Sequence, residues 1–110
     1  MHTLEDLRAG RLHGITRLNL CQHLTHFPQE IFALGDSLEV LDLSGNRLSE
    51  LPEDLHRLNR LKVLFCSNNQ FTHLPHAIDS CQALETVGFK SNRISRVDAQ
   101  ALPHSTEATG

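Results

Sequence analysis

The stretch that decides the fold is LEVLDLSGNRL, residues 38–48. Its leucines stand at offsets 0, +3, +5 and +10 from Leu38, and an asparagine stands at +8. The same offsets return from Leu61 and from Leu84, so the step is 61 − 38 = 84 − 61 = 23 residues. The two later copies are filled by Leu61, Leu64, Cys66, Asn69 and Phe71, and by Leu84, Val87, Phe89, Asn92 and Ile94. A fixed period of this size indicates a solenoid, in which each repeat buries its apolar side against its neighbours.

This pattern resembles the leucine-rich repeat, L-x-x-L-x-L-x-x-N-x-L, over most of the chain, from about Ile15 to Val97. The following segments, LPEDLHRL at 51–58 and LPHAI at 74–78, resemble the 23-residue class of bacterial, intracellular plant and Ras-suppressor-like proteins. The resemblance implies an α/β fold, a short right-handed leucine-rich-repeat solenoid. Its parallel concave sheet would have about four strands, with short helical or irregular segments outside.

The period divides the chain into a cap, four repeats and a tail. We expect an N-terminal cap over residues 1–14, repeats over 15–37, 38–60, 61–83 and, in part, 84–98, and a polar tail over 99–110. Thr3 followed by Asp6 resembles a capping box, and Leu4 and Leu7 would form the apolar side of a capping helix. That helix could also be a docking element. A cap is favoured, because the first repeat of a solenoid has no neighbour on one side.

The first repeat departs from the pattern. Its loop, residues 21–28, is one residue shorter than residues 44–52, and only Gln22 or His23 stands near the place of the asparagine. The next segment, residues 29–37, is one residue longer and restores the period. We therefore expect the strand of this repeat to form with an altered turn.

The fourth repeat stops after Asp98, and the next start would fall at 84 + 23 = 107, inside the polar tail. The sequence shows no evident C-terminal cap. The apolar residues of the last repeat should then lie at an open edge. Ala99, Ala101 and Leu102 could fold over part of it; otherwise a second copy in a homodimer, or further repeats, should cover it. The apolar residues at this edge are Leu84, Val87, Phe89, Ile94 and Val97.

Asn46, Asn69 and Asn92 resemble the asparagine ladder of the family. The chain must turn sharply after each strand, and this leaves backbone N–H and C=O groups in the interior of the coil. An amide side chain can pair with both, because it offers donors and an acceptor. A role in ligand binding is the less favoured alternative.

Residues between the inward leucines must point outward from the strands, because side chains alternate along a strand. The outward columns predict a partner-binding face on the concave side. An apolar patch of Val40, Val63 and Phe65 would be its centre, since an exposed phenylalanine in a preformed concavity can anchor a partner. The alternative is that the valines merely stabilise strands. The predicted face comprises Arg17, Asn19, Val40, Asp42, Val63, Phe65, Thr86 and Lys90.

The sequence offers little sign of chemistry. No phosphate-binding glycine loop, G-x-S-x-G, H-E-x-x-H or C-x-x-C occurs, so we expect no catalytic residue and no cofactor. His26, His73 and His76 raise the hypothesis of a metal site. However, the column that His26 and His73 share also holds Glu50 and Arg96, which is typical of solvated surface. We expect no bound metal.

Charge and composition exclude other classes of partner. The net charge of −3 gives no electrostatic footprint for nucleic acid or an acidic membrane, and no apolar run could span a bilayer. The start lacks the apolar segment of a signal peptide, and three cysteines without framework spacing suggest a reducing compartment. We therefore expect a cytoplasmic protein.

The function favoured by the sequence is protein–protein recognition through the concave face. Four strands about 4.8 Å apart span about 14 Å, and strands of about five residues are about 17 Å long, so the face would have an area of only about 240 Å². This is below the ~800 Å² per partner of a standard interface. The chain is therefore expected to belong to a longer protein. Its repeats also resemble, more loosely, those that precede bacterial protein kinases. Three alternatives stay open: a regulatory or substrate-recruiting segment of such a kinase, the same role in an effector ligase, and a purely structural oligomerisation segment.

Overall fold

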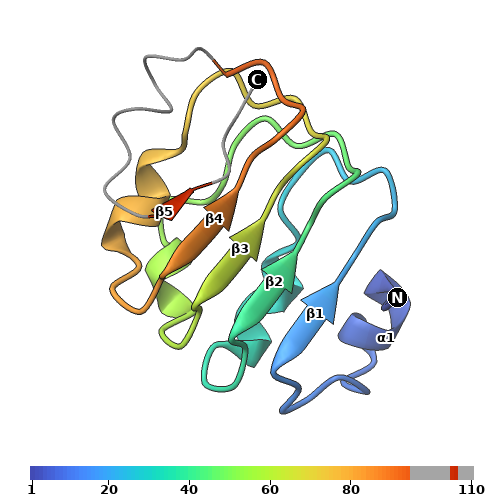
Figure 1. Cartoon of the computed structure of the whole chain (residues 1–110). Helices are drawn as coiled ribbons and strands as arrows, with labels where there is room; N and C mark the ends of the chain where they lie inside the picture. The colour runs from blue at the N-terminus through green and yellow to red at the C-terminus, as the bar shows by residue number, and fades with distance from the viewer. Residues whose placement is uncertain (95–104, 107–110) are drawn as a thin grey trace.

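The protein is built on a parallel sheet whose strands follow one another in chain order (Figure 1). The computed structural model describes residues 1–94 and 105–106. Its first four strands are β1 (Arg17–Asn19), β2 (Val40–Asp42), β3 (Val63–Phe65) and β4 (Thr86–Gly88). Each strand pairs with the residues one repeat away, so that Leu41 lies between Leu18 and Leu64. The predicted solenoid with four parallel strands is confirmed.

Three short 3-10 helices return the chain from one strand to the next. They are η1 (Gln29–Leu34), η2 (Leu55–Arg57) and η3 (His76–Ser80), and they lie behind the sheet, on the convex side (Figure 1). Pro28 and Pro75 directly precede η1 and η3. Proline suits this place, because its fixed φ and missing N–H cost nothing at the start of a helix.

The core lies between the sheet and the 3-10 helices. The inward residues in and directly after the three regular strands are fully buried, from Leu41 and Leu43 at β2 to Val87 and Phe89 at β4. Alternation therefore works as expected: leucines face in, and the residues between them face out. Phe71 and Phe89 pack edge to face, with ring centroids 5.1 Å apart, and join the third coil to the fourth.

The N-terminal segment covers the first coil. Helix α1 (Leu4–Arg8) begins where the Thr3 hydroxyl accepts the Asp6 N–H, and Leu7 is buried against the core. Gln22 accepts the N–H of Leu4 through its side-chain oxygen at 2.8 Å, so the residue near the missing asparagine position ties α1 to the first turn.

The first turn differs from the later ones, as its shorter loop predicts. In the regular repeats the left-handed residue stands three places before the next inward residue, as Gly45 does before Leu48 and Asn68 before Phe71. In the first repeat it is His23, with φ 56°, directly before Leu24. This tighter turn leaves no place for a ladder asparagine.

The C-terminal edge is not open, and this corrects the prediction from the sequence. A fifth strand, β5 (Ser105–Thr106), pairs in parallel with β4. Leu84, Val87 and Phe89 are all buried within the single chain, as is Ile94. The predicted Val97 lies outside the described residues, as do Ala99, Ala101 and Leu102. Because β5 follows β4 by 105 − 86 = 19 residues rather than 23, the repeat period gave no sign of it. The reason for expecting a homodimer at this edge is therefore lost.

Candidate functional site

The three asparagines that follow the strands hold successive coils together. Asn46 donates through Nδ2 to the carbonyls of Leu20 and Leu43 at 2.9 and 2.8 Å. Its oxygen accepts the N–H groups of Gln22 and Leu24, both at 3.0 Å. One side chain therefore satisfies four backbone groups of two coils.

The next two asparagines repeat this arrangement. Asn69 donates to the carbonyls of Leu43 and Cys66 and accepts the N–H of Leu48. Asn92 makes the corresponding bonds to the third coil, including the N–H of Phe71. Their donors and acceptors are engaged by backbone, which favours a structural role over ligand binding.

The outward side chains form two aligned columns across the sheet. The first runs through Arg17, Val40, Val63 and Thr86, and the second through Asn19, Asp42, Phe65 and Gly88. Most of these residues are half-buried; Arg17 is exposed and Gly88 is buried. The sheet thus brings together all but one of the residues that the sequence assigned to the face. The remaining one, Lys90, is exposed and lies two residues beyond the end of β4.

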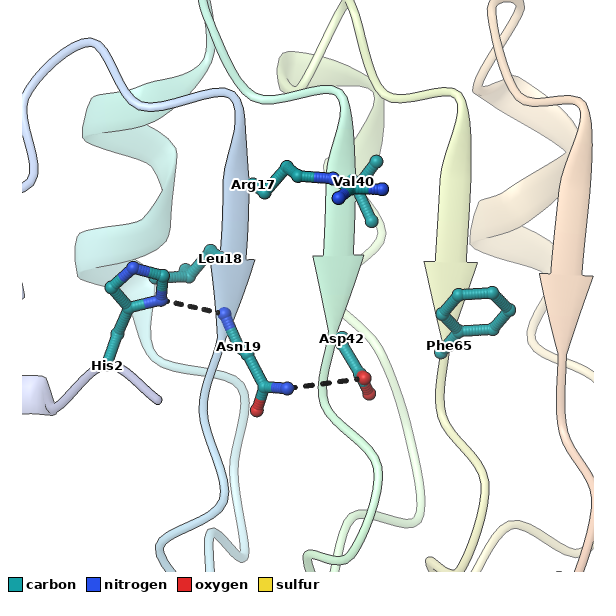
Figure 2. A pocket seen from close by; sticks show the side chains of 7 residues that line it. All are labelled: His2, Arg17, Leu18, Asn19, Val40, Asp42 and Phe65. Atoms are coloured by element: carbon teal, nitrogen blue, oxygen red, sulfur yellow. Dashed lines mark hydrogen bonds between the residues drawn. The ribbon is translucent and has the colours of Figure 1, made fainter.

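A shallow pocket of about 270 Å³ opens on the first three strands (Figure 2). The Phe65 ring lies at one end and the His2 ring at the other, with Val40 between them. It is lined by His2, Arg17, Leu18, Asn19, Val40, Asp42 and Phe65.

His2 is the lining residue that sequence reasoning missed. Its backbone N–H donates to the Asn19 carbonyl at 2.9 Å, and its ring nitrogen Nδ1 accepts the Asn19 N–H at 3.0 Å (Figure 2). His2 therefore covers the outer edge of β1 and becomes a wall of the pocket. No pattern could have found it, because it lies before the repeats.

The charged side chains of Asp42 and Arg17 differ in the number of hydrogen bonds that they make within the protein. Asp42 accepts the Ser44 N–H at 3.0 Å through one carboxylate oxygen and the Asn19 amide at 3.4 Å through the other. The Arg17 side chain makes no hydrogen bond or ion pair to any residue that the structure describes. Its guanidinium extends from β1 toward Val40 (Figure 2).

A second depression, of about 250 Å³, lies beside the turns of the second and third coils. Glu50, Glu53, His73 and His76 contribute to its lining. Within residues 1–94, where side chains are described, no group of three or more histidine, cysteine or acidic side chains could hold a metal ion. The described side chains around these histidines therefore do not form a metal-binding group of three or more.

The three cysteines are all free, and two of them are buried in the core. Burial raises the pKa of the Cys66 thiol and raises that of Cys81 to about 11. Cys21 is exposed, and its thiol donates to the Gly45 carbonyl at 3.3 Å. Since a thiol is reactive only as the thiolate, Cys66 and Cys81 are inert packing residues in the folded chain.

These features define a repeat protein that presents the open face of a short, rigid parallel sheet. Residues 13–71 match the family described as leucine rich repeat. The chain belongs to the leucine-rich-repeat family.

Individual relatives support this assignment. The transforming growth factor beta activator LRRC32 of Mus musculus is 39% identical over 100 residues, which is 87% of this chain and 15% of that protein. A probable serine/threonine-protein kinase of Dictyostelium discoideum, roco9, is 51% identical over 43 residues, 38% of this chain and 1% of that protein. The structure of a leucine-rich-repeat protein of Leptospira interrogans superposes with a TM-score of 0.72 and 34% identity, covering 86% of this chain and 24% of that one.

The chain thus spans a small part of each of these proteins. Repeat domains of this family are typically non-catalytic modules, and their concave surfaces are suited to binding. Among the described residues, no helix is both long and apolar enough to cross a membrane.

Proposed function

We propose that the concave face binds another protein, with the pocket on β1–β3 at the centre of the contact. The observation that carries this is the position of Phe65. Its side chain is only half-buried and stands on the outward side of a rigid strand, next to Val40 and Val63, while the inward leucines already supply the core. Aromatic side chains in such places are typical anchors of interfaces.

The proposal is tested by photo-crosslinking in cells of the source organism. Benzoylphenylalanine in place of Val63 should give a protein adduct, and the same residue in place of the convex His56 should not. Phe65→Ala should remove the adduct with little loss of thermal stability, because the ring is only half-buried. Phe71→Ala, at a fully buried ring, is the comparison for stability and should cost about 3–5 kcal/mol. Equal adducts from both faces would refute the proposal.

A longer protein is part of this proposal. The face is small, and the chain covers only a fraction of its relatives, so further repeats or a second domain would complete the binding surface. A regulatory or substrate-recruiting role beside a kinase is one form of it, supported by the short match to the Dictyostelium kinase. Reading the gene beyond Gly110 separates that form from an effector ligase or an oligomerisation segment. The three free cysteines favour a cytoplasmic location.

A further inference from the structure

We infer that the pocket on β1–β3 takes a peptide segment in which a large apolar side chain stands next to Asp or Glu. This inference rests on the proposed function and specifies the chemistry of the partner. Three observations carry it: the size and lining of the pocket, the unsatisfied charge of Arg17, and the engaged state of Asp42.

The size of the pocket fits one side chain of a partner. Its volume of about 270 Å³ lies just below the ~300 Å³ at which sites for small molecules begin. Val40 and the Phe65 ring provide apolar contact, and they lie on neighbouring strands that the ladder holds rigidly. A leucine, methionine or phenylalanine of the partner would gain the most from this surface.

The charge available to a partner is positive. Arg17 is exposed and its side chain has no partner among the described residues, and its guanidinium presents a fork of N–H donors that matches a carboxylate. Asp42 carries the opposite charge, but each of its oxygens already accepts a hydrogen bond, from Ser44 and from Asn19. An acidic partner residue could therefore use every N–H donor of the Arg17 guanidinium, whereas a basic one would share the Asp42 carboxylate with Ser44 and Asn19.

Asn19 completes the fit to an extended peptide. Its amide nitrogen donates to Asp42, and its side-chain oxygen accepts no hydrogen bond from the described residues, so it can accept a partner N–H. Asn19 and Arg17 are two residues apart on the same face of β1, a separation of about 7 Å. Neighbouring groups of an extended peptide can reach both.

The test is selection of phage-displayed random twelve-residue peptides on the full chain, followed by fluorescence anisotropy with labelled synthetic peptides. Selected peptides should share an apolar residue beside Asp or Glu. Replacing that acid by its amide, or Arg17 by Gln, should weaken binding about fivefold. Arg60→Gln, at an exposed residue outside the pocket, should leave the affinity unchanged. Asp42→Asn should strengthen binding, because it removes a negative charge beside the acidic residue of the peptide, and raising the salt concentration should weaken binding.

Two outcomes separate this inference from the function on which it rests. Selected peptides that carry Lys or Arg, and that bind less well to Asp42→Asn, would overturn the inference. If those peptides still need Phe65, the proposed binding face stands. Failure to select any peptide that depends on Phe65 would overturn both.

Discussion

At the scale of single residues, the ladder asparagines show how a polar group can stabilise an apolar coil. Asn69 is 8% exposed, and its amide reaches the backbone of two coils. A buried backbone group without a partner costs more than a typical hydrogen bond contributes, so the ladder matters chiefly by preventing that loss.

We expect Asn69→Ala to lower the free energy of unfolding by about 1–3 kcal/mol, because the Leu48 N–H would stay buried without a partner and the Leu43 carbonyl would keep only its hydrogen bond from Asn46. Urea denaturation followed by circular dichroism measures the change. Gln70→Ala is the matched control, since the Gln70 side chain is exposed and its backbone bond to Leu48 would remain. Equal midpoints for the two variants would contradict the structural role of the ladder.

The cysteines give a second prediction at this scale. At about pH 8, iodoacetamide should modify only Cys21 in the folded protein and all three cysteines after unfolding, as counted by mass spectrometry. The cause is burial, which raises the pKa of Cys66 and Cys81 and keeps both as unreactive thiols. Their raised pKa stabilises the fold below the pKa of an unfolded thiol, about 8.5, and this contribution is lost as the pH rises toward the folded values. Rapid modification of Cys66 in the folded state would contradict its burial.

At the scale of elements, the 3-10 helices must pack closely for the repeats to stack. Gly35, at the end of η1, lies against η2: a Cβ there would be 2.7 Å from the Arg57 carbonyl oxygen and 3.2 Å from that of Phe32. Both neighbours are backbone atoms, which cannot move aside as a flexible side chain can. The Arg57 guanidinium also stacks on the Phe32 ring, 4.2 Å from its centroid, at the same contact.

Gly35→Ala should therefore destabilise the protein by about 1–3 kcal/mol through overpacking between η1 and η2. Differential scanning calorimetry would show the effect as a lower Tm. Ala33→Ser, at an exposed position of the same 3-10 helix, is the control and should change Tm little. If Gly35→Ala melted like the parent protein, the two elements could not be as close as the structure has them.

At the scale of the whole molecule, both ends of the sheet are covered by segments outside the regular repeats. Two hydrogen bonds join His2 to the backbone of Asn19 at β1, and β5 pairs with β4. The Cα radius of gyration is 13.0 Å, close to the ~13 Å of an ordinary domain of this length. Unpaired backbone groups at a strand edge can pair with another chain, so we expect His2 and β5 to favour the monomer by covering the two edges.

We expect a chain shortened to residues 1–94 to self-associate, because it lacks β5 and leaves the backbone of Thr86 and Val87 unpaired. Sedimentation velocity over about a tenfold range of concentration would measure this. A chain that ends at Thr106 keeps β5 and is the control. Monomers at every concentration for both chains would show that β5 does not protect the edge.

The sequence by itself determined the repeat, the strand register and the inward and outward faces. Each is a consequence of spacing along the chain: 23 residues place Leu41 beside Leu64, and alternation turns Leu41 inward and Val40 outward. The inward positions of the ladder asparagines follow from the same register.

Only the tertiary structure decided which contacts are made by residues that lie outside the 23-residue repeats. It placed His2 at the pocket and β5 beside β4, and it showed that Asp42 is engaged while the Arg17 side chain has no partner among the described residues. A period can predict the neighbours of a residue only where the chain repeats. At the two ends, contacts depend on how an irregular segment folds back, and that is a matter of three-dimensional packing rather than of spacing in the sequence.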